Sequence, residues 1–249
     1  MNESAIFSQQ FDIQSHHISE NFEISLQYLL GCLQQTADRH VDSFHIGWND
    51  LKAKGCFWAI YRMGLKISKL PRKYDRITVR TWANPPQNLL QPRSFEVLDC
   101  DGNQLVYAQS IWIILDFEHF RPQKIDDILG PDVLSNMSDC PPFSLSLKIA
   151  KIMGEQIFTP VTRDVLYSDI DTNQHVNNTV YPRWLVDSFP IDFLRSHRLI
   201  EMTINYVQQA RLGDRYDVST VRAADGRLAT TIARHNTNDD FCKITTRWE

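Results

Sequence analysis

Between residues 24 and 44, apolar residues recur at steps of three and four, which predicts a long helix with one apolar stripe. Four strand-like stretches follow, and the last two flank Asp101-Gly102, a strong two-residue hairpin signal. The first half is therefore expected to hold a short strand from Ile6-Phe7, a helix and four antiparallel strands. The four strands are predicted at 56–67, 75–82, 93–100 and 104–116.

The second half repeats this order. Ile157-Phe158 is expected to open a strand, and a helix is predicted from about 178 to 189, where Pro190 stops its continuation. Asp225-Gly226 supplies a second hairpin signal among the strands that follow. Those strands are predicted at 200–209, 214–224, 227–236 and 240–248.

Two similar units in one chain indicate a duplication and predict a pseudo-two-fold pair. Residues 117–155 lie between them, contain four prolines and show little periodicity, so they are interpreted as a connector. The predicted fold class is α+β, with each half a long helix packed on an antiparallel sheet. The predicted division is 1–116 as an N-terminal unit, 117–155 as a linker and 156–249 as a C-terminal unit.

Composition narrows the range of functions. The 249 residues carry a net charge of −4, which argues against nucleic acid as a partner, because phosphate binding needs a basic excess. Five scattered cysteines without a CxxC pair, and histidines without ligand spacing, predict neither disulfides nor a metal site. No stretch is long and apolar enough to span a membrane, and the first residues lack a signal-peptide pattern, so the expected location is the cytoplasm.

The candidate chemistry lies in residues 167–178, a polar run between a predicted strand and a helix N-terminus. Asp171, Asn173 and His175 alternate, so an extended loop would direct their side chains to one side. A carboxylate, an amide and an imidazole together can activate water or attack an acyl carbon. Backbone N–H groups near Val176 and Asn177 are predicted to stabilise an oxyanion.

A purely structural role competes with this interpretation, because Asp and Asn are common in loops that cap helices. Aligning the halves by eye on Tyr28 and Tyr181 places Ile18, Glu20 and Phe22 opposite the three polar residues. In that register the polar set occurs in only one half, which favours a functional site.

Residues 169–178, followed by Tyr181 and Trp184, closely resemble the hallmark segment of the acyl-ACP thioesterases of plant plastids and bacteria. The resemblance covers nearly the whole chain. In the first half it includes Trp58, Arg62 and Arg93, together with Asp101-Gly102. The other matching positions there are Gln34, Ala37, Pro71, Thr81-Trp82, Asp99, Ser110, Trp112, Leu115-Asp116 and Arg121-Pro122.

The resemblance implies a double, tandem hot-dog fold, hydrolysis of fatty acyl-ACP thioesters to free fatty acid, and no cofactor. It also implies that Asp171, Asn173 and His175 are catalytic. Where the plant enzymes have an adjacent Glu-Cys pair, this chain has Gln209-Ala210. A cysteine nucleophile at that position is therefore excluded, although Gln209 can still orient water by hydrogen bonding.

The expected mechanism uses Asp171 either as general base on water or as a nucleophile, and the sequence does not separate the two. The N-terminal half is expected to hold the acyl-chain pocket, with Trp58 and Arg62 as substrate-binding residues. These positions are also typical of plain core. A basic run is the candidate docking site for acyl carrier protein, although such runs are usually solvated strand ends. It comprises Lys66, Lys69, Arg72 and Lys73.

Two alternatives remain open at this level. One is an acyl-CoA thioesterase, and the other is a catalytically inactive fatty-acyl binding protein, which the absence of glutamate at position 209 favours. The chain is expected to be a monomeric pseudo-dimer or a homodimer. Preferred chain length does not follow from the sequence.

Overall fold

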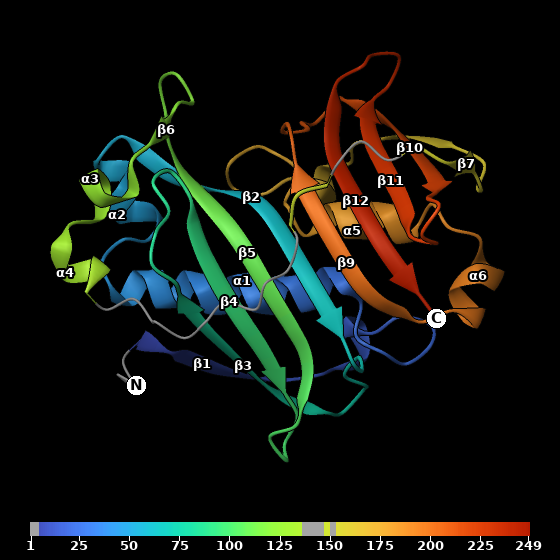
Figure 1. Ribbon diagram of the computed structural model, residues 1–249, viewed down its shortest axis with the longest axis horizontal. Coiled ribbons are helices and arrows are strands. Elements are labelled where there is room, and N and C mark those ends of the chain that lie inside the picture. The colour runs from blue at the N-terminus through green and yellow to red at the C-terminus, as the bar shows by residue number, and fades with distance from the viewer. Residues whose placement is uncertain (1–4, 136–146, 150–152) are drawn as a thin grey trace. The chain divides into compact units, whose positions relative to one another are not determined.

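The computed structural model describes residues 5–135, 147–149 and 153–249 (Figure 1). By their internal contacts, residues 1–63 with 68–145 form one compact unit, and residues 64–67 with 146–249 form a second. None of the helices formed by the described residues has the length and apolar character needed to cross a bilayer.

The sheet of the first unit has the strand order β1-β3-β4-β5-β2, with β6 added to β5. The β4–β5 hairpin turns through Gly102, whose φ of +83° suits glycine. The elements are β1 (Phe7–Asp12), a 3-10 turn (Ser15–His17), α1 (Leu26–Ser43), α2 (Trp48–Ala53), β2 (Cys56–Ile67), β3 (Arg76–Ala83), β4 (Gln91–Leu98), β5 (Gln104–Asp116), β6 (Pro122–Gln123), α3 (Ile125–Leu129) and α4 (Pro131–Leu134).

Helix α1 forms where the apolar stripe predicts it. Ser25 caps its N-terminus, since its side chain accepts a hydrogen bond from the Tyr28 N–H at 3.2 Å. Leu29 and Leu33 are fully buried on the stripe, and the helix packs on β1 and β3 (Figure 1). Burying these side chains, at about 1.5–3 kcal/mol each, holds the helix on the sheet.

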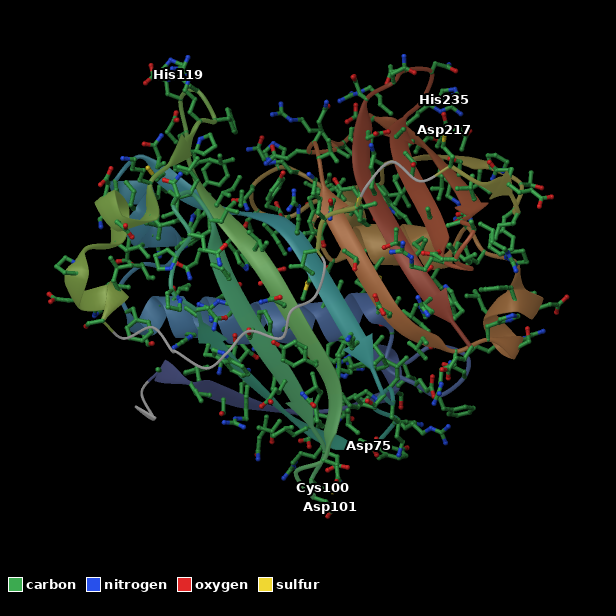
Figure 2. All side chains as sticks on the ribbon, viewed as in Figure 1. Asp75, Cys100, Asp101, His119, Asp217 and His235 are labelled. Atoms are coloured by element: carbon green, nitrogen blue, oxygen red, sulfur yellow. The ribbon has the colours of Figure 1, made fainter. Side chains whose placement is uncertain are left out.

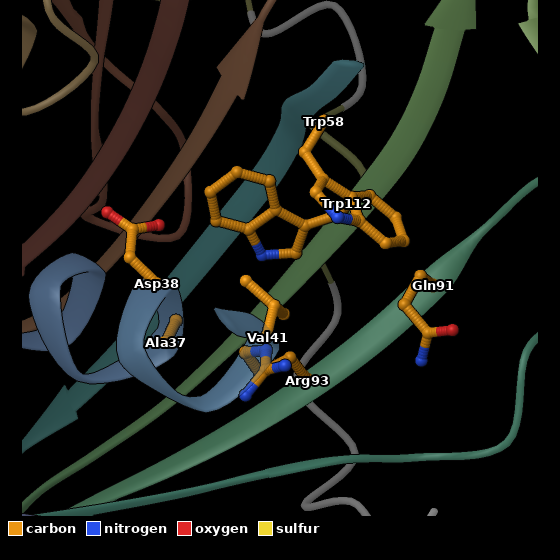
Figure 3. A pocket seen from close by; sticks show the side chains of 7 residues that line it. All are labelled: Ala37, Asp38, Val41, Trp58, Gln91, Arg93 and Trp112. Carbon is orange, nitrogen blue, oxygen red and sulfur yellow. The ribbon is translucent and has the colours of Figure 1, made fainter. Parts of the chain in front are cut away.

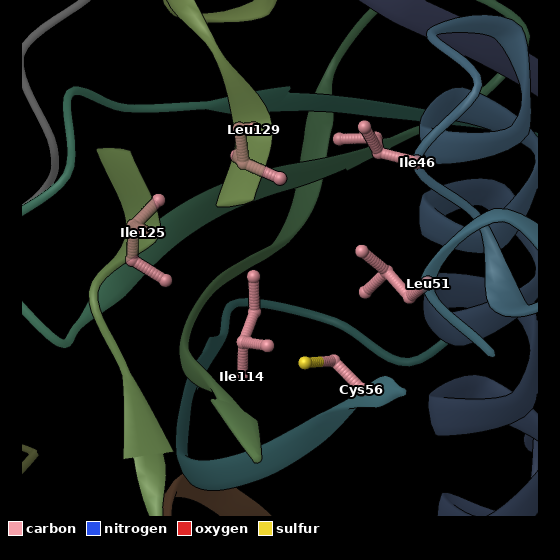
Figure 4. Close-up of a cluster of buried hydrophobic side chains, with 6 residues drawn as sticks. All are labelled: Ile46, Leu51, Cys56, Ile114, Ile125 and Leu129. Carbon is pink, nitrogen blue, oxygen red and sulfur yellow. The ribbon is translucent and has the colours of Figure 1, made fainter. Parts of the chain in front are cut away.

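Part of the predicted linker is packed into the first unit. Ile125 and Leu129 of α3 are buried against Leu51 and Ile114 in an apolar cluster that also contains Ile46 and Cys56 (Figure 4). The Nζ of Lys54 donates to the Ile128 carbonyl at 2.8 Å. Residues 136–146 and 150–152 of the predicted linker lie outside the described residues.

The sheet of the second unit has the order β9-β12-β11-β10, with β7 and β8 both paired to β10. His235, just after β11, shares a hydrogen bond with Asp217 of β10 at 2.9 Å (Figure 2). The elements are β7 (Glu155–Gln156), β8 (Val161–Asp164), a 3-10 turn (Tyr167–Asp169), α5 (Val180–Val186), α6 (Ile191–Ser196), β9 (Leu199–Tyr206), β10 (Arg215–Arg222), β11 (Leu228–Arg234) and β12 (Asp240–Trp248).

The eight strands predicted after the two helices are confirmed, three of them to the residue: 56–67, 104–116 and 240–248. The predicted helix from about 178 to 189 is too long, because α5 ends at Val186 and Pro190 begins the separate helix α6. Ile157-Phe158 does not open a strand. The Phe158 ring instead packs on Phe189 at 4.8 Å and Phe193 at 5.3 Å, so its apolar character serves helix packing.

Candidate active site

The polar run before α5 folds into a tight turn. Ile170 and Val176 form an isolated antiparallel bridge, and within it the Asp171 N–H donates to the His175 carbonyl at 2.9 Å. The Gln174 N–H donates back to the Asp171 carbonyl at 3.0 Å. Gln174 itself has a φ of +62°, the left-handed conformation that closes the turn.

This turn brings the three predicted catalytic residues together. Asp171 and His175 are half-buried at its two ends, and Asn173 is exposed at its tip. The Oδ1 of Asp171 accepts the Asn173 N–H at 2.8 Å, which fixes the carboxylate relative to the turn. Among the described residues, the hydrogen bond to the Asp171 carboxylate is made at Oδ1. The second oxygen, Oδ2, is therefore available to a ligand.

His175 is held in its neutral form. Desolvation lowers the pKa of its imidazole, the Arg211 guanidinium lowers it further, and the Asp171 carboxylate acts in the opposite direction. A neutral imidazole has one N–H donor and one acceptor nitrogen. His175 is therefore equipped to hydrogen-bond both a polar substrate atom and a water molecule near neutral pH.

A buried ion pair anchors the turn to α5. Asp169 is 1% exposed, accepts the Leu166 N–H at 2.9 Å and is bound by the Arg183 guanidinium from the helix. On the other side, the Tyr181 hydroxyl accepts the Ala210 N–H at 3.3 Å. Sequence reasoning assigned no role to these residues, and no spacing rule connects Asp169 to Arg183.

The expected oxyanion donors need a correction. The Val176 N–H donates to the Ala210 carbonyl at 2.9 Å, and the Asn177 N–H donates to the Asp169 carbonyl at 2.9 Å. Each amide already has an acceptor within the fold. Neither is therefore a free donor for a thioester oxygen in this structure.

The segment from Gln209 to Arg211 runs beside the turn, since Ala210 receives the Val176 N–H. The exposed Gln209 side chain has no hydrogen-bond partner among the residues that the structure describes. Arg211 was not predicted from the sequence, yet its charge acts on His175. The signal that could have identified it is its position two residues after Gln209, in the segment that follows β9.

The remaining predicted residues lie elsewhere. Trp58 lines a pocket beside α1. Arg62 stacks on Tyr61, with its guanidinium carbon 4.3 Å from the ring centroid and its Nη2 2.9 Å from the hydroxyl. Lys69 and Arg72 are exposed and Lys73 is half-buried on the first unit, whereas the exposed Lys66 belongs by its contacts to the second.

The hydrogen bonds also correct the register between the halves. In the first unit, the Ser19 N–H donates to the Glu23 carbonyl and the Phe22 N–H to the Ser19 carbonyl, as Asp171, His175 and Gln174 do in the second. The equivalents of the three candidate residues are thus Ser19, Asn21 and Glu23, one position later than the alignment by eye. Both turns are polar, so polarity alone does not distinguish them.

The described residues contain no group of three His, Cys, Asp or Glu side chains arranged to hold a metal ion. The turn itself supplies a carboxylate, an amide and an imidazole.

The arrangement of helices and strands defines a class by fold, the α+β hot-dog fold. The acyl-ACP thioesterase of Bacteroides thetaiotaomicron superposes with a TM-score of 0.88 over 100% of both chains at 23% identity. The 12:0-ACP thioesterase of Umbellularia californica gives a TM-score of 0.87 at 19% identity, covering 98% of this chain and 97% of the other. These likenesses confirm the predicted α+β hot-dog fold.

Sequence models then give the family. Residues 4–131 match the acyl-ACP thioesterase N-terminal domain, and residues 157–249 match the C-terminal domain. The chain belongs to the acyl-ACP thioesterase family, as the resemblance predicted.

Among curated relatives, the chloroplastic palmitoyl-acyl carrier protein thioesterase of Arabidopsis thaliana is 27% identical over 92% of this chain and 59% of its own length. The corresponding protein of Cuphea hookeriana is 26% identical over 83% of this chain and 52% of its own. The chain thus spans little more than half the length of these two relatives.

Proposed function

We propose that this protein hydrolyses fatty acyl thioesters carried on acyl carrier protein and releases the free fatty acid. The observation that carries the proposal is the turn before α5, which gathers Asp171, Asn173 and His175 within the family's C-terminal domain. The relatives are named as palmitoyl-, oleoyl- and dodecanoyl-ACP hydrolases, which supports the same substrate class.

In the proposed mechanism, the second carboxylate oxygen of Asp171 either takes a proton from the attacking water or attacks the thioester carbonyl carbon itself. The Asn173 amide, exposed at the tip of the turn, donates to the thioester carbonyl oxygen and stabilises the developing negative charge. Neutral His175 positions water or the thioester and supplies a proton to the departing thiolate. Gln209 orients the attacking water by hydrogen bonding and does not act as a base.

Asp171 can take a proton from water or attack the carbonyl itself. Single-turnover hydrolysis in water labelled with heavy oxygen tests the direct route, because label found in Asp171 requires an anhydride at that residue. Direct attack forms an acyl-enzyme anhydride, and when water attacks its Asp171 carbonyl the label enters the carboxylate of the enzyme. General-base catalysis places the label only in the released fatty acid.

Release of free thiol from acyl-ACP tests the function itself. We expect turnover by the wild-type protein and a loss of about two or more orders of magnitude in Asp171→Ala, with an unchanged circular dichroism spectrum. Asp164→Ala is a matched control, since Asp164 ends β8 and makes an exposed ion pair with Arg215 at 2.9 Å. Tight acyl binding without thiol release would instead support the inactive binding protein.

The carrier is proposed to dock on the first unit near Lys69, Arg72 and Lys73. Tyr74 stands among them, 78% exposed and at a φ of +74°, with the Nζ of Lys73 4.7 Å from its ring centroid. A non-glycine residue in that conformation is strained, so exposure of the ring at this point suits a contact surface. Cations around an aromatic ring are complementary to an acidic helical partner.

Parallel kinetics with matched carrier and coenzyme A thioesters test docking and the acyl-CoA alternative together. Reversing Lys69 and Arg72 to Glu should raise KM for the carrier substrate at least tenfold and leave the coenzyme A substrate nearly unchanged. Arg222→Glu, on the second unit, is the control. Equal effects on both substrates would remove the carrier surface from the proposal.

The division of labour between the halves is part of the same proposal: acyl-chain binding in residues 1–116, with Trp58 and Arg62, and catalysis in residues 156–249. The position of Trp58 beside a pocket supports it. A cytoplasmic location and the oligomeric state stay predictions.

A further inference from the structure

The first unit contains a pocket beside α1 that is not apolar throughout. It is a small cavity of about 40 Å³, and residues of α1, β2, β4 and β5 line it (Figure 3). Trp58 and Trp112 form an apolar part of its wall, because their indole N–H groups are already used. They donate to the Ile46 carbonyl at 3.0 Å and the Ser110 hydroxyl at 2.8 Å.

Arg93 contributes a buried cation to this wall. Its side chain is 5% exposed, and its Nη1 lies 3.2 Å from the Thr81 hydroxyl and 3.0 Å from the Nδ1 of His40. Among the described residues, no carboxylate comes within ion-pair distance of Arg93. Buried arginines are seldom left without an anion, because a desolvated charge costs several kcal/mol.

His40 does not supply the missing charge. Burial and the neighbouring Arg93 cation lower the pKa of His40 to about 3, so the ring is neutral. Because a guanidinium only donates, Nδ1 of His40 is the acceptor and the proton is on Nε2. Thr81 and His40 are therefore neutral acceptors, and the guanidinium retains donors for another partner.

Asp38 supplies an acceptor at the open side of the same pocket. Asp38 is partly accessible to solvent. Desolvation by the neighbouring protein atoms and the charge of Asp42 raise the pKa of its carboxyl to about 6, whereas the Arg93 cation acts to lower it. Asp38 and Arg93 thus influence each other across the pocket without an ion pair between them. In the view of Figure 3 the two indole rings lie between Asp38 on α1 and Gln91 on β4.

We infer that this pocket binds the hydroxyl group of a hydroxylated acyl chain, with the Arg93 guanidinium donating a hydrogen bond to the hydroxyl oxygen and the Asp38 carboxylate accepting a hydrogen bond from the hydroxyl O–H. The inference rests on the proposed function, since it names the substrate class of the same enzyme. A hydroxyl both donates and accepts, so it can hydrogen-bond the Arg93 guanidinium and the Asp38 carboxylate together. A methylene in the same place would remove water from both groups and offer no hydrogen bond in return. The indole rings pack against the neighbouring methylenes.

The test compares a dodecanoyl thioester of pantetheine with its series of monohydroxy isomers, each with the hydroxyl at one chain carbon. We expect one isomer, or two adjacent ones, to exceed the plain substrate in kcat/KM by about tenfold or more, the order expected for a hydrogen bond to a charged group. Asp38→Leu should reduce that preference to about twofold or less. Asp38→Asn, which keeps an acceptor, should retain part of it.

Arg39→Leu, an exposed neighbour on the same helix, is the control and should leave the preference unchanged. Equal rates for all isomers, or a preference that survives in Asp38→Leu, would overturn the inference while the hydrolase proposal stands. If no thioester is hydrolysed at all, the proposed function fails. Calorimetry with the corresponding non-hydrolysable amides then tests the hydroxyl-binding inference by itself. Equal affinity for amides with and without the hydroxyl would overturn that inference.

Discussion

The strand-to-helix junctions of the two halves have the same backbone and different side chains. In each, the third residue of the 3-10 turn accepts the N–H three residues before it: His17 through Nδ1 at 3.0 Å, and Asp169 through Oδ2 at 2.9 Å. In the tight turn that follows, 19–23 or 171–175, the fourth residue is Phe22 or Gln174, and each has a φ of +62°. The backbone is therefore a property of the duplicated fold and needs no catalytic explanation.

The neighbouring segments repeat as well. The Ile24 N–H donates to the Pro71 carbonyl in the first half, as the Val176 N–H does to that of Ala210 in the second. The turns that follow begin with Arg72 and Arg211, whose N–H groups are both accepted by an aspartate three residues on, at 2.7 and 2.9 Å. Only the side chains at the junction differ in chemistry.

That difference supports the proposal that the active site is in the second half. In the first half, Ser19 and Glu23 are tied through Asn21, with bonds of 2.7 and 3.0 Å, and Arg72 lies 3.7 Å from Glu23. The polar groups of that turn are thus satisfied internally. In the second half, Asp171 uses one oxygen on the turn, and His175 remains neutral beside Arg211. The two turns thus share one backbone, and the proposed chemistry belongs to the copy whose polar groups are not tied to one another.

The largest effect should come from exchanging the polar side chains between the two turns. Placing the residues of the first half on the second turn, as Asp171→Ser with His175→Glu, should reduce kcat/KM by about two or more orders of magnitude. The same backbone already accepts these residues, so the melting temperature should change little. The reverse exchange, Ser19→Asp with Glu23→His, should leave activity intact. Activity surviving the first exchange would place the chemistry outside the turn.

The next effect concerns stability. Asp169 is buried against Arg183, whereas its counterpart His17 stacks on Tyr28 with ring centroids 3.5 Å apart. Arg183→Leu leaves a buried carboxylate without its cation and should lower the free energy of unfolding by about 2–4 kcal/mol, less than for a fully buried pair because Arg183 is a third exposed. Denaturant titration measures it. Recovery in Asp169→Asn with Arg183→Leu would confirm that the unpaired charge is the cause.

A smaller effect is expected in the turns that begin with Arg72 and Arg211. Tyr74 occupies a left-handed position with a φ of +74°, and its counterpart is Gly213, with a φ of +93°. Gly213→Tyr should cost about 1–2 kcal/mol of unfolding free energy, because only glycine adopts this conformation without strain. Tyr74→Gly should be neutral or stabilising. A destabilised Tyr74→Gly would show that the exposed ring makes contacts within the fold.

The sequence predicted the parts of the molecule governed by local pattern. The stripe of α1, the strands and the two Asp-Gly hairpins follow from periodicity and turn chemistry. The polar run with the three candidate residues was identified from its composition and its place before a helix, but it folds into a tight turn and not into the extended loop that the alternation argument assumed. Features that depend on tertiary hydrogen bonds were not predicted: the break between α5 and α6, the use of the Val176 and Asn177 amides, and the one-residue register between the halves.

The smallest expected effect tests the electrostatic part of the comparison. Arg211 acts on a neutral histidine in the second half, whereas Arg72 pairs with a glutamate in the first. Removing the cation in Arg211→Gln should raise the pKa of His175, because the protonated imidazole would lose a repulsive neighbour while Asp171 still attracts it. If neutral His175 is needed for turnover, the acidic limb of the kcat/KM profile should move to higher pH. Arg222→Gln should leave the limb in place. A limb that stays unmoved in Arg211→Gln would mean that another group controls it, and His175 would lose its place in the proton transfer.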